Sequence, residues 1–163
     1  MGIFVHILSS SNTLKEKWIM KLRSVQHEEE ESSETLLDTE AEYFTDEYGD
    51  RVISYEETEA TGMEGSVTEI HVAPDGTVSI IRTGFFQTHL VMQMGKKYFC
   101  NYETPFGEFT VGVSAKKIHN HLTEDGGTLE LHYIADANTT LLSDNEVYVE
   151  LSRLNSPDDT EED

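Results

Sequence analysis

Apolar and polar residues alternate at a period of two through most of this chain, and short turn-forming segments interrupt the alternation. Trp18, Met20 and Leu22, for example, fall on one face of a strand, and Lys17, Lys21 and Arg23 fall on the other. Successive side chains of a β-strand point to opposite faces, so this pattern is typical of strands with one buried face. Few windows show the i, i+3, i+4, i+7 spacing of an amphipathic helix. The sequence therefore predicts an all-β fold.

Turn signals such as Ala73-Pro74-Asp75-Gly76 divide the alternating stretches into about 8–10 strands. Short turns favour antiparallel pairing of neighbours, and closing the sheet removes the unpaired edges that invite aggregation. We therefore expect an antiparallel up-and-down meander β-barrel. The expected strands cover residues 18–25, 41–47, 51–57, 67–72, 77–82, 87–94, 98–104, 108–122, 128–135 and 146–154.

The hairpin around Asp125-Gly126 shows which side of the sheet faces inward. If this pair centres the turn, paired positions sum to about 249, which places Ile118 opposite Leu131. Apolar residues then dominate that face, whereas lysine, histidine and glutamate side chains fill the other. We expect the apolar face to point into the barrel.

The expected barrel domain covers residues 15–154 of the 163-residue chain. Residues 1–14 form an expected leader, poorly ordered or adding a strand, and residues 155–163 an expected acidic disordered tail. The apolar run at residues 3–8 is shorter than the span of roughly 20 residues that a membrane helix needs, and it lacks the basic start of a secretory signal. We therefore expect a cytoplasmic protein.

The charge balance excludes several partners. Thirty-two Asp and Glu residues outnumber eleven Lys and Arg residues, and the formal net charge is −21. Nucleic-acid binding requires clustered cations, and attachment to anionic membrane surfaces requires a polybasic segment. We expect neither partner. Cys100, the single cysteine, cannot form an internal disulfide.

A histidine-rich face is the metal-binding candidate that the sequence offers. His119 and His121 project to one side of their strand, and His132 and Glu130 lie on the partner strand. Three imidazoles and a carboxylate are zinc ligands. The cluster lies on the solvated face, and the sequence shows no partner that would orient its imidazole rings, so we interpret it as an ordinary polar face and expect neither a metal nor a cofactor.

Arg82 is the most informative charged residue, because it ends an apolar strand in a chain with four arginines. Directed inward, its guanidinium would suit a ligand carboxylate or carbonyl. The alternative is a guanidinium stacked on Trp18 or a tyrosine, closing one barrel end. Tyr102 and Tyr133, on aromatic-rich strands, are the other expected ligand-binding residues of the interior. We expect no catalytic residue.

Several motifs resemble a family of small bacterial β-barrels, the YwiB-like family (domain-of-unknown-function family 1934). They are the segments 55–57, 61–68, 82–84, 102–107 and 127–133, of which Tyr-x-Thr-Pro-Phe-Gly and Arg-x-Gly are the most specific. The resemblance covers residues 15–154 and implies a lipocalin- or calycin-like barrel, but no catalytic residues. The Gly-x-Trp signature of lipocalins and the Arg-x-Tyr anchor of fatty-acid-binding proteins are absent, which argues against a fatty-acid role.

Three function hypotheses follow. The first is a non-enzymatic barrel that holds a small apolar or carboxylate-bearing ligand. The second is a protein-interaction module that uses its acidic outer surface. The third, ranked last, is a hydrolase or isomerase inside the barrel, for which His71 or His89 would be the first candidates. Fold alone does not choose between them, and either a monomer or a homodimer is compatible with the sequence.

Overall fold

The computed structural model describes residues 16–104, 106–138 and 140–154. The expected leader (1–14) and tail (155–163) therefore lie outside the described residues. Within those residues the chain forms ten strands and one short 3-10 helix, η1 (Glu59–Thr61), and no helix has the length and apolarity to cross a membrane. The strands are β1 (Trp18–Glu28), β2 (Glu31–Thr45), β3 (Arg51–Glu56), β4 (Val67–Val72), β5 (Val78–Thr83), β6 (Thr88–Met92), β7 (Lys97–Thr104), β8 (Gly107–Thr123), β9 (Gly126–Ala137) and β10 (Thr140–Arg153).

Each strand pairs with its neighbours in sequence, and β1 pairs with β10 to close the barrel. The up-and-down β-barrel expected from the sequence is thereby confirmed. The expected register of the β8–β9 hairpin is also confirmed, since Ile118 pairs with Leu131 and Asn120 with Leu129. Leu129 and Leu131 are fully buried, as the inward orientation of this face requires.

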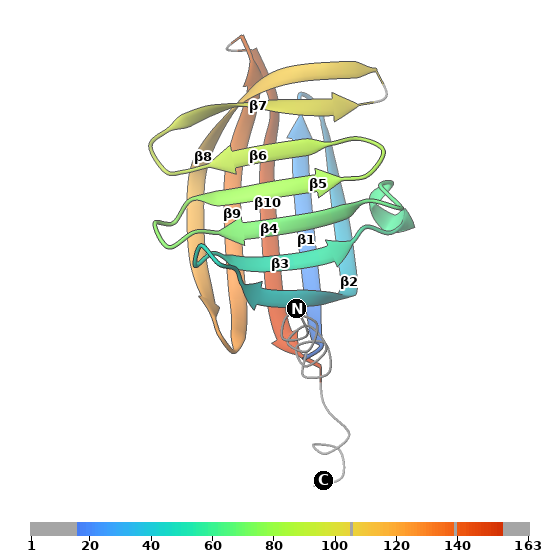
Figure 1. The fold of residues 1–163 in the computed structure, drawn as a ribbon. Coiled ribbons are helices and arrows are strands. Elements are labelled where there is room, and N and C mark those ends of the chain that lie inside the picture. Colours follow the sequence, from blue (N-terminus) through green and yellow to red (C-terminus); the bar gives the residue numbers. More distant parts are fainter. Residues whose placement is uncertain (1–15, 105, 139, 155–163) are drawn as a thin grey trace, which may run out of the picture.

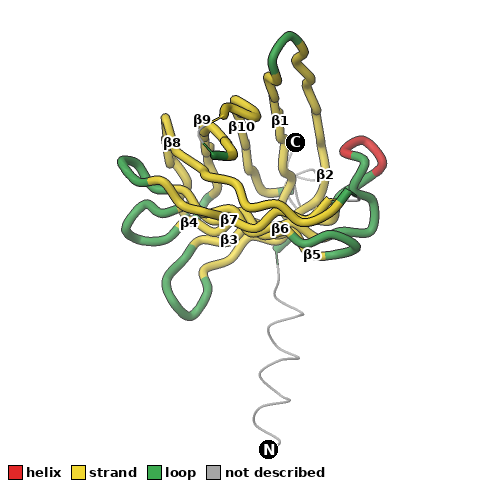
Figure 2. Tube along the Cα trace, turned by 90° about the horizontal axis from the view of Figure 1, so that it is seen from above, coloured by secondary structure: helices red, strands yellow, loops and turns green. Residues whose placement is uncertain are grey.

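The barrel is flattened into two faces that cross at a steep angle. Figure 1 shows β3 to β7 running across the front of β1, β9 and β10. The two longest strands, β2 and β8, form the corners: β2 pairs with β1 over residues 31–41 and with β3 over residues 42–45. β8 pairs with β7 over residues 107–114 and with β9 over residues 112–123, with a register shift between Ala115 and Lys117. Figure 2 shows the same arrangement from above, with β3 to β7 on one side and β9 and β10 on the other.

The start of β2 differs from the expectation that this strand covers residues 41–47. The acidic residues that follow β1 form the hairpin turn, with Glu29 in the left-handed conformation (φ 47°), and β2 begins at Glu31. Polar residues dominate its first half, so the apolar alternation that reveals other strands is lacking there. Pairing with β1 holds this half of β2 in the sheet, although its sequence pattern does not indicate a strand.

The inward face of β1 changes from apolar to polar along the strand. Trp18 and Met20 are buried in the core, whereas Ser24, Gln26 and Glu28 line a cavity. The same change occurs on β10, where Leu151 and Val149 belong to the core and Asn145 and Ser143 line the cavity. One half of the barrel is therefore packed with apolar side chains, and the other half is hollow and lined by both polar and apolar side chains.

The pairing of β6 with β7 is the least regular in the barrel. Its register contains a single pair, Thr88 with Tyr102, whose side chains line the cavity. Next to it, the sulfur of buried Cys100 accepts a hydrogen bond from the Val91 amide at 3.5 Å. Burial raises the pKa of the Cys100 thiol, which favours its protonated form.

Candidate functional site

The interior cavity has a volume of about 440 Å³ and is the candidate functional site. Its apolar walls come from both faces of the barrel and include Leu22, Ile80, Leu90, Val111, Val113 and Val147. Phe109 and Leu142 also line it, although they are 51% and 44% exposed. The cavity is therefore open to solvent at this end, opposite the packed half of the barrel.

A lateral row of inward side chains crosses one wall of the cavity. Each member pairs in register with the next across six successive strands, β3 to β8. Because register partners share a face, this row places its polar groups side by side. The row is Tyr55, Thr68, Arg82, Thr88, Tyr102 and Phe109.

Glu57 places a carboxylate beside this row. It follows β3, where its amide donates to the carbonyl of Ser66 at 2.8 Å, and its side chain is 1% exposed. The Thr68 hydroxyl donates to Glu57 Oε2, and Arg82 Nη2 lies 3.4 Å from the same oxygen. Arg82 Nε donates to Thr68 Oγ1 at 3.2 Å. A buried ion pair, bridged by a hydroxyl, thus stands at the cavity wall.

Arg82 lines the cavity and does not close the end of the barrel. The guanidinium that stacks on Trp18 belongs to Arg153, whose Cζ lies 4.9 Å from the ring centroid. Tyr43 packs edge-on against the same indole ring, with centroids 5.0 Å apart. The aromatic stack considered for Arg82 therefore forms with a different arginine at the packed end.

Tyr102 and Tyr133 also line the cavity, so the structure brings together all three residues singled out for the interior. Burial raises the pKa of the Tyr133 hydroxyl to about 12, with a smaller contribution from nearby Tyr102. Burial likewise raises the pKa of Tyr55, next to Glu57. At neutral pH both phenols are protonated, and the Tyr133 hydroxyl can donate a hydrogen bond into the cavity.

Sequence reasoning missed Glu57, Tyr55, Thr68 and Asn145. The alternation of β3 would have found the first two, because Ile53, Tyr55 and Glu57 share one phase of the strand. Asn145 is the register partner of Tyr133, and its amide donates to the Ser143 hydroxyl at 2.9 Å. No local pattern indicates that these positions face a cavity rather than packed neighbours.

The histidines singled out as surface candidates lie on the outer face. His119 and His121 line a groove of about 540 Å³, with ring centroids 6.3 Å apart. His132 instead pairs with Asp144, with Nε2 2.6 Å from Oδ1. Lys117 contacts Glu130, with Nζ 3.2 Å from Oε2. Within the described part of the chain, none of these residues joins a group of three closely spaced metal ligands.

The fold and the cavity define a class: a closed up-and-down β-barrel in which a cavity with apolar walls and a row of polar side chains lies beside an apolar core. Comparison with known families shows to which of them the chain belongs. Residues 20–149 match the family "Domain of unknown function (DUF1934)", and the chain belongs to this family.

Among solved structures, the chain is similar to the ywiB protein from Bacillus subtilis, known from a crystal structure. The two chains are 17% identical with a TM-score of 0.73, and the alignment covers 86% of this chain and 94% of that one. At this identity the likeness supports the fold alone. No curated protein matches the sequence.

Proposed function

We propose that this barrel is a binding protein for a small molecule that combines a carboxylate group with an apolar body. The observation that carries the proposal is the buried pair of Arg82 and Glu57 at the wall of an apolar-lined cavity. A buried ion pair gives little or no net stability over apolar side chains of similar volume. Its placement beside open space therefore supports a role in recognition.

The donors at this wall suit an anionic oxygen pair. Arg82 has five N–H groups, of which the Nε–H is bonded to Thr68 and one Nη2–H faces Glu57. The remaining guanidinium donors and the hydroxyls of Tyr102 and Tyr133 are available to a ligand. Charge-assisted bonds from a guanidinium to a carboxylate are shorter and stronger than neutral ones.

The rest of the cavity suits a short apolar body. Its volume of about 440 Å³ falls within the usual range of ligand sites, about 300–1,000 Å³. Eight leucine, isoleucine and valine side chains line the cavity, together with Met63, Ala135 and Phe109. Burial of an apolar body against them would contribute the hydrophobic part of the affinity.

The contents of the cavity support binding rather than catalysis. Its described lining contains neither histidine nor cysteine, which are frequent general bases and nucleophiles. His89 is exposed on the outer side of β6, and His71 does not line the cavity either. The two residues first considered for a reaction inside the barrel are therefore outside it.

Calorimetric titration with octanoate and with 1-octanol tests the proposal, because the two probes share an apolar chain and differ in the carboxylate. We expect octanoate to bind at least about tenfold more tightly, since a hydrogen bond to a charged group contributes about 1.5–3 kcal/mol. The double substitution Arg82→Met and Glu57→Gln should abolish this preference. Tyr133→Phe should weaken octanoate binding while leaving octanol binding unchanged.

Arg23→Met is the matched control, because Arg23 pairs with Glu34 on the outer face and both side chains are about half exposed. Equal binding of the two probes, or loss of binding in the control, would overturn the proposal. Native mass spectrometry of freshly purified protein gives an independent test, in which a bound ligand adds mass that unfolding removes. If neither probe binds and no added mass is found, the alternative, an interaction module with an acidic outer surface, is favoured.

A further inference from the structure

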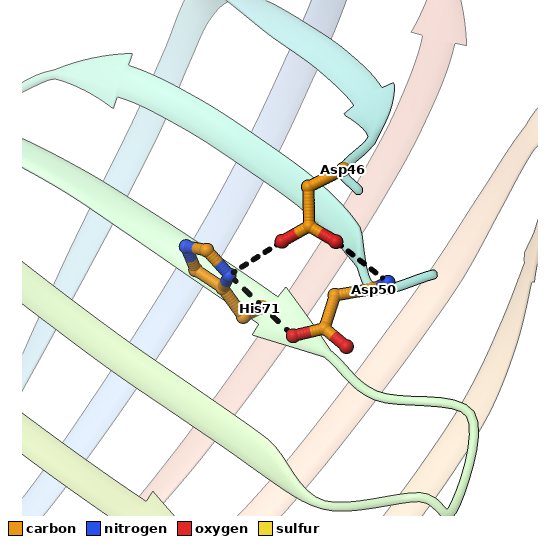
Figure 3. Close-up of side chains that lie close together, drawn as sticks. All are labelled: Asp46, Asp50 and His71. Atoms are coloured by element: carbon orange, nitrogen blue, oxygen red, sulfur yellow. Dashed lines mark hydrogen bonds and ion pairs between the residues drawn. The ribbon is translucent and has the colours of Figure 1, made fainter. Parts of the chain in front are cut away.

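A second cluster of ligand-type side chains lies on the outer face of the barrel. Asp46 and Asp50 belong to the turn between β2 and β3, and His71 lies on β4 beside it. His71 Nδ1 lies 3.8 Å from Asp46 Oδ2 and 3.7 Å from Asp50 Oδ2. Figure 3 shows the two carboxylates converging on this nitrogen. The three side chains are about four-fifths buried.

The local fold holds the two aspartates in place. Asp46 Oδ1 accepts hydrogen bonds from the amides of Tyr48 and Asp50, each at 2.9 Å, which leaves Oδ2 directed at His71. The Asp46 amide donates to the Asp50 carbonyl at 2.9 Å. The turn is therefore fixed by its own backbone before any ligand binds, and both carboxylates are presented to β4.

His71 is oriented by a further carboxylate. Its Nε2 lies 2.9 Å from Glu69 Oε1, a distance at which the Nε2–H donates to the carboxylate. In the neutral imidazole, Nδ1 then carries the lone pair, and this lone pair faces the two aspartates. Glu69 thus stands in the arrangement of the carboxylate–histidine–zinc triads, in which a carboxylate that does not touch the metal fixes the tautomer of the ligating ring.

The spacing within this cluster differs from that of an ordinary histidine–carboxylate contact. His132 Nε2 lies 2.6 Å from Asp144 Oδ1, a direct hydrogen bond. His71 Nδ1, in contrast, stands beyond hydrogen-bonding distance from both aspartates. Ligand atoms around a tetrahedral ion with bonds of about 2.0–2.1 Å lie about 3.3–3.4 Å apart. The two nitrogen–oxygen distances exceed that spacing by about 0.3–0.5 Å, and all three ligand atoms lie within 4.8 Å of one another.

We propose that Asp46, Asp50 and His71 bind one divalent transition-metal ion of the Zn²⁺ type, with Glu69 accepting the hydrogen bond that orients His71. An imidazole and two carboxylates are ligands that Zn²⁺ accepts, whereas Mg²⁺ and Ca²⁺ favour sets made of oxygen alone. A fourth position is left for water. The ion would tie the β2–β3 turn to β4, and its binding energy would add to the stability of the barrel.

Calorimetric titration of EDTA-treated, desalted full-length protein with Zn²⁺ tests this site at physiological ionic strength. We expect one ion per chain, a raised unfolding temperature, and no comparable binding of Mg²⁺. His71→Gln and Asp50→Asn should each abolish that binding, and Glu69→Gln should weaken it by about 10–100-fold. Co²⁺ in place of Zn²⁺ should give the visible absorption of a four-coordinate site in the wild type and not in His71→Gln.

His132→Gln is the matched control, because it removes an outer-face histidine that also faces a carboxylate. It should retain the Zn²⁺ stoichiometry and the Co²⁺ spectrum. The proposal is overturned if Zn²⁺ fails to bind, if binding survives His71→Gln, or if Mg²⁺ binds equally well, which would indicate diffuse attraction to an acidic chain. Unfolding curves of the metal-free variants show whether a lost site reflects lost structure.

Discussion

Replacing Arg82 by methionine should destabilise the barrel by about 3 kcal/mol, because it leaves Glu57 buried without the guanidinium that faces it. The Glu57 side chain is 1% exposed, and Arg82 Nη2 lies 3.4 Å from its Oε2. At an effective dielectric constant of about 20, two unit charges at this distance attract by about 5 kcal/mol. Arg82 is 20% exposed and borders an open cavity, so solvent screening reduces the measurable loss.

The double variant provides the decisive comparison. Adding Glu57→Gln to Arg82→Met removes the orphaned charge, and we expect the free energy of unfolding to return to within about 1 kcal/mol of the wild type. Urea unfolding of the wild type, both single variants and the double variant completes a thermodynamic cycle. A loss below about 1 kcal/mol for Arg82→Met, or additive losses in the double variant, would refute this reasoning.

Three further predictions concern packing and pH. Gly126 and Gly76 have almost the same positive φ (96° and 92°), but a Cβ at Gly126 would lie 2.4 Å from a backbone carbonyl oxygen, whereas nothing lies within 4 Å at Gly76. Measured by thermal unfolding, Gly76→Ala should lower the free energy of unfolding by about 1–2 kcal/mol, the effect of the positive φ alone. Gly126→Ala should lower it by at least about 1–3 kcal/mol more, because the added Cβ also meets the carbonyl oxygen. Equal losses in the two variants would contradict this steric argument. In urea unfolding, Leu131→Ala should lower the free energy of unfolding by about 3 kcal/mol, because this side chain is fully buried. Leu36→Ala, at a position 65% exposed, should change it by no more than about 0.5 kcal/mol. Burial raises the pKa of Tyr133 from 10.0 to about 12. Between about pH 10 and pH 12 the folded state therefore keeps the phenol proton and the unfolded state releases it. The free energy of unfolding should be constant with respect to this group below about pH 10 and should fall as the pH rises toward 12. The loss should approach about 3 kcal/mol and should be smaller in Tyr133→Phe, and an unfolding free energy independent of pH in this window would count against the burial of the phenol.

Much of the fold could be predicted because strand patterning is local. The β8–β9 register follows from one turn position, and the closed meander follows from the succession of short turns. The first half of β2 could not be predicted in the same way, because residues 31–40 lack apolar alternation and depend on pairing with β1. Tertiary pairing can impose a strand where the local pattern is weak.

The candidate site could be predicted in part. Arg82, Tyr102 and Tyr133 stand out by residue type, and all three line the cavity. Glu57 is separated from Arg82 by 25 positions, and only the register of β3, β4 and β5 brings them together. The cluster around His71 could not be predicted either, because its aspartates come from a turn and its histidine comes from a later strand.

The sequence by itself determined most of the strands, the turns and the phase of most inward side chains, because each of these depends on residues close together in the chain. Only the tertiary structure decided that one half of the barrel is packed and the other hollow. Whether an inward side chain meets neighbours or open space depends on the volumes that all ten strands bring to the interior. The same closure decided which charges meet, and so placed the Glu57–Arg82 pair at the wall of the cavity.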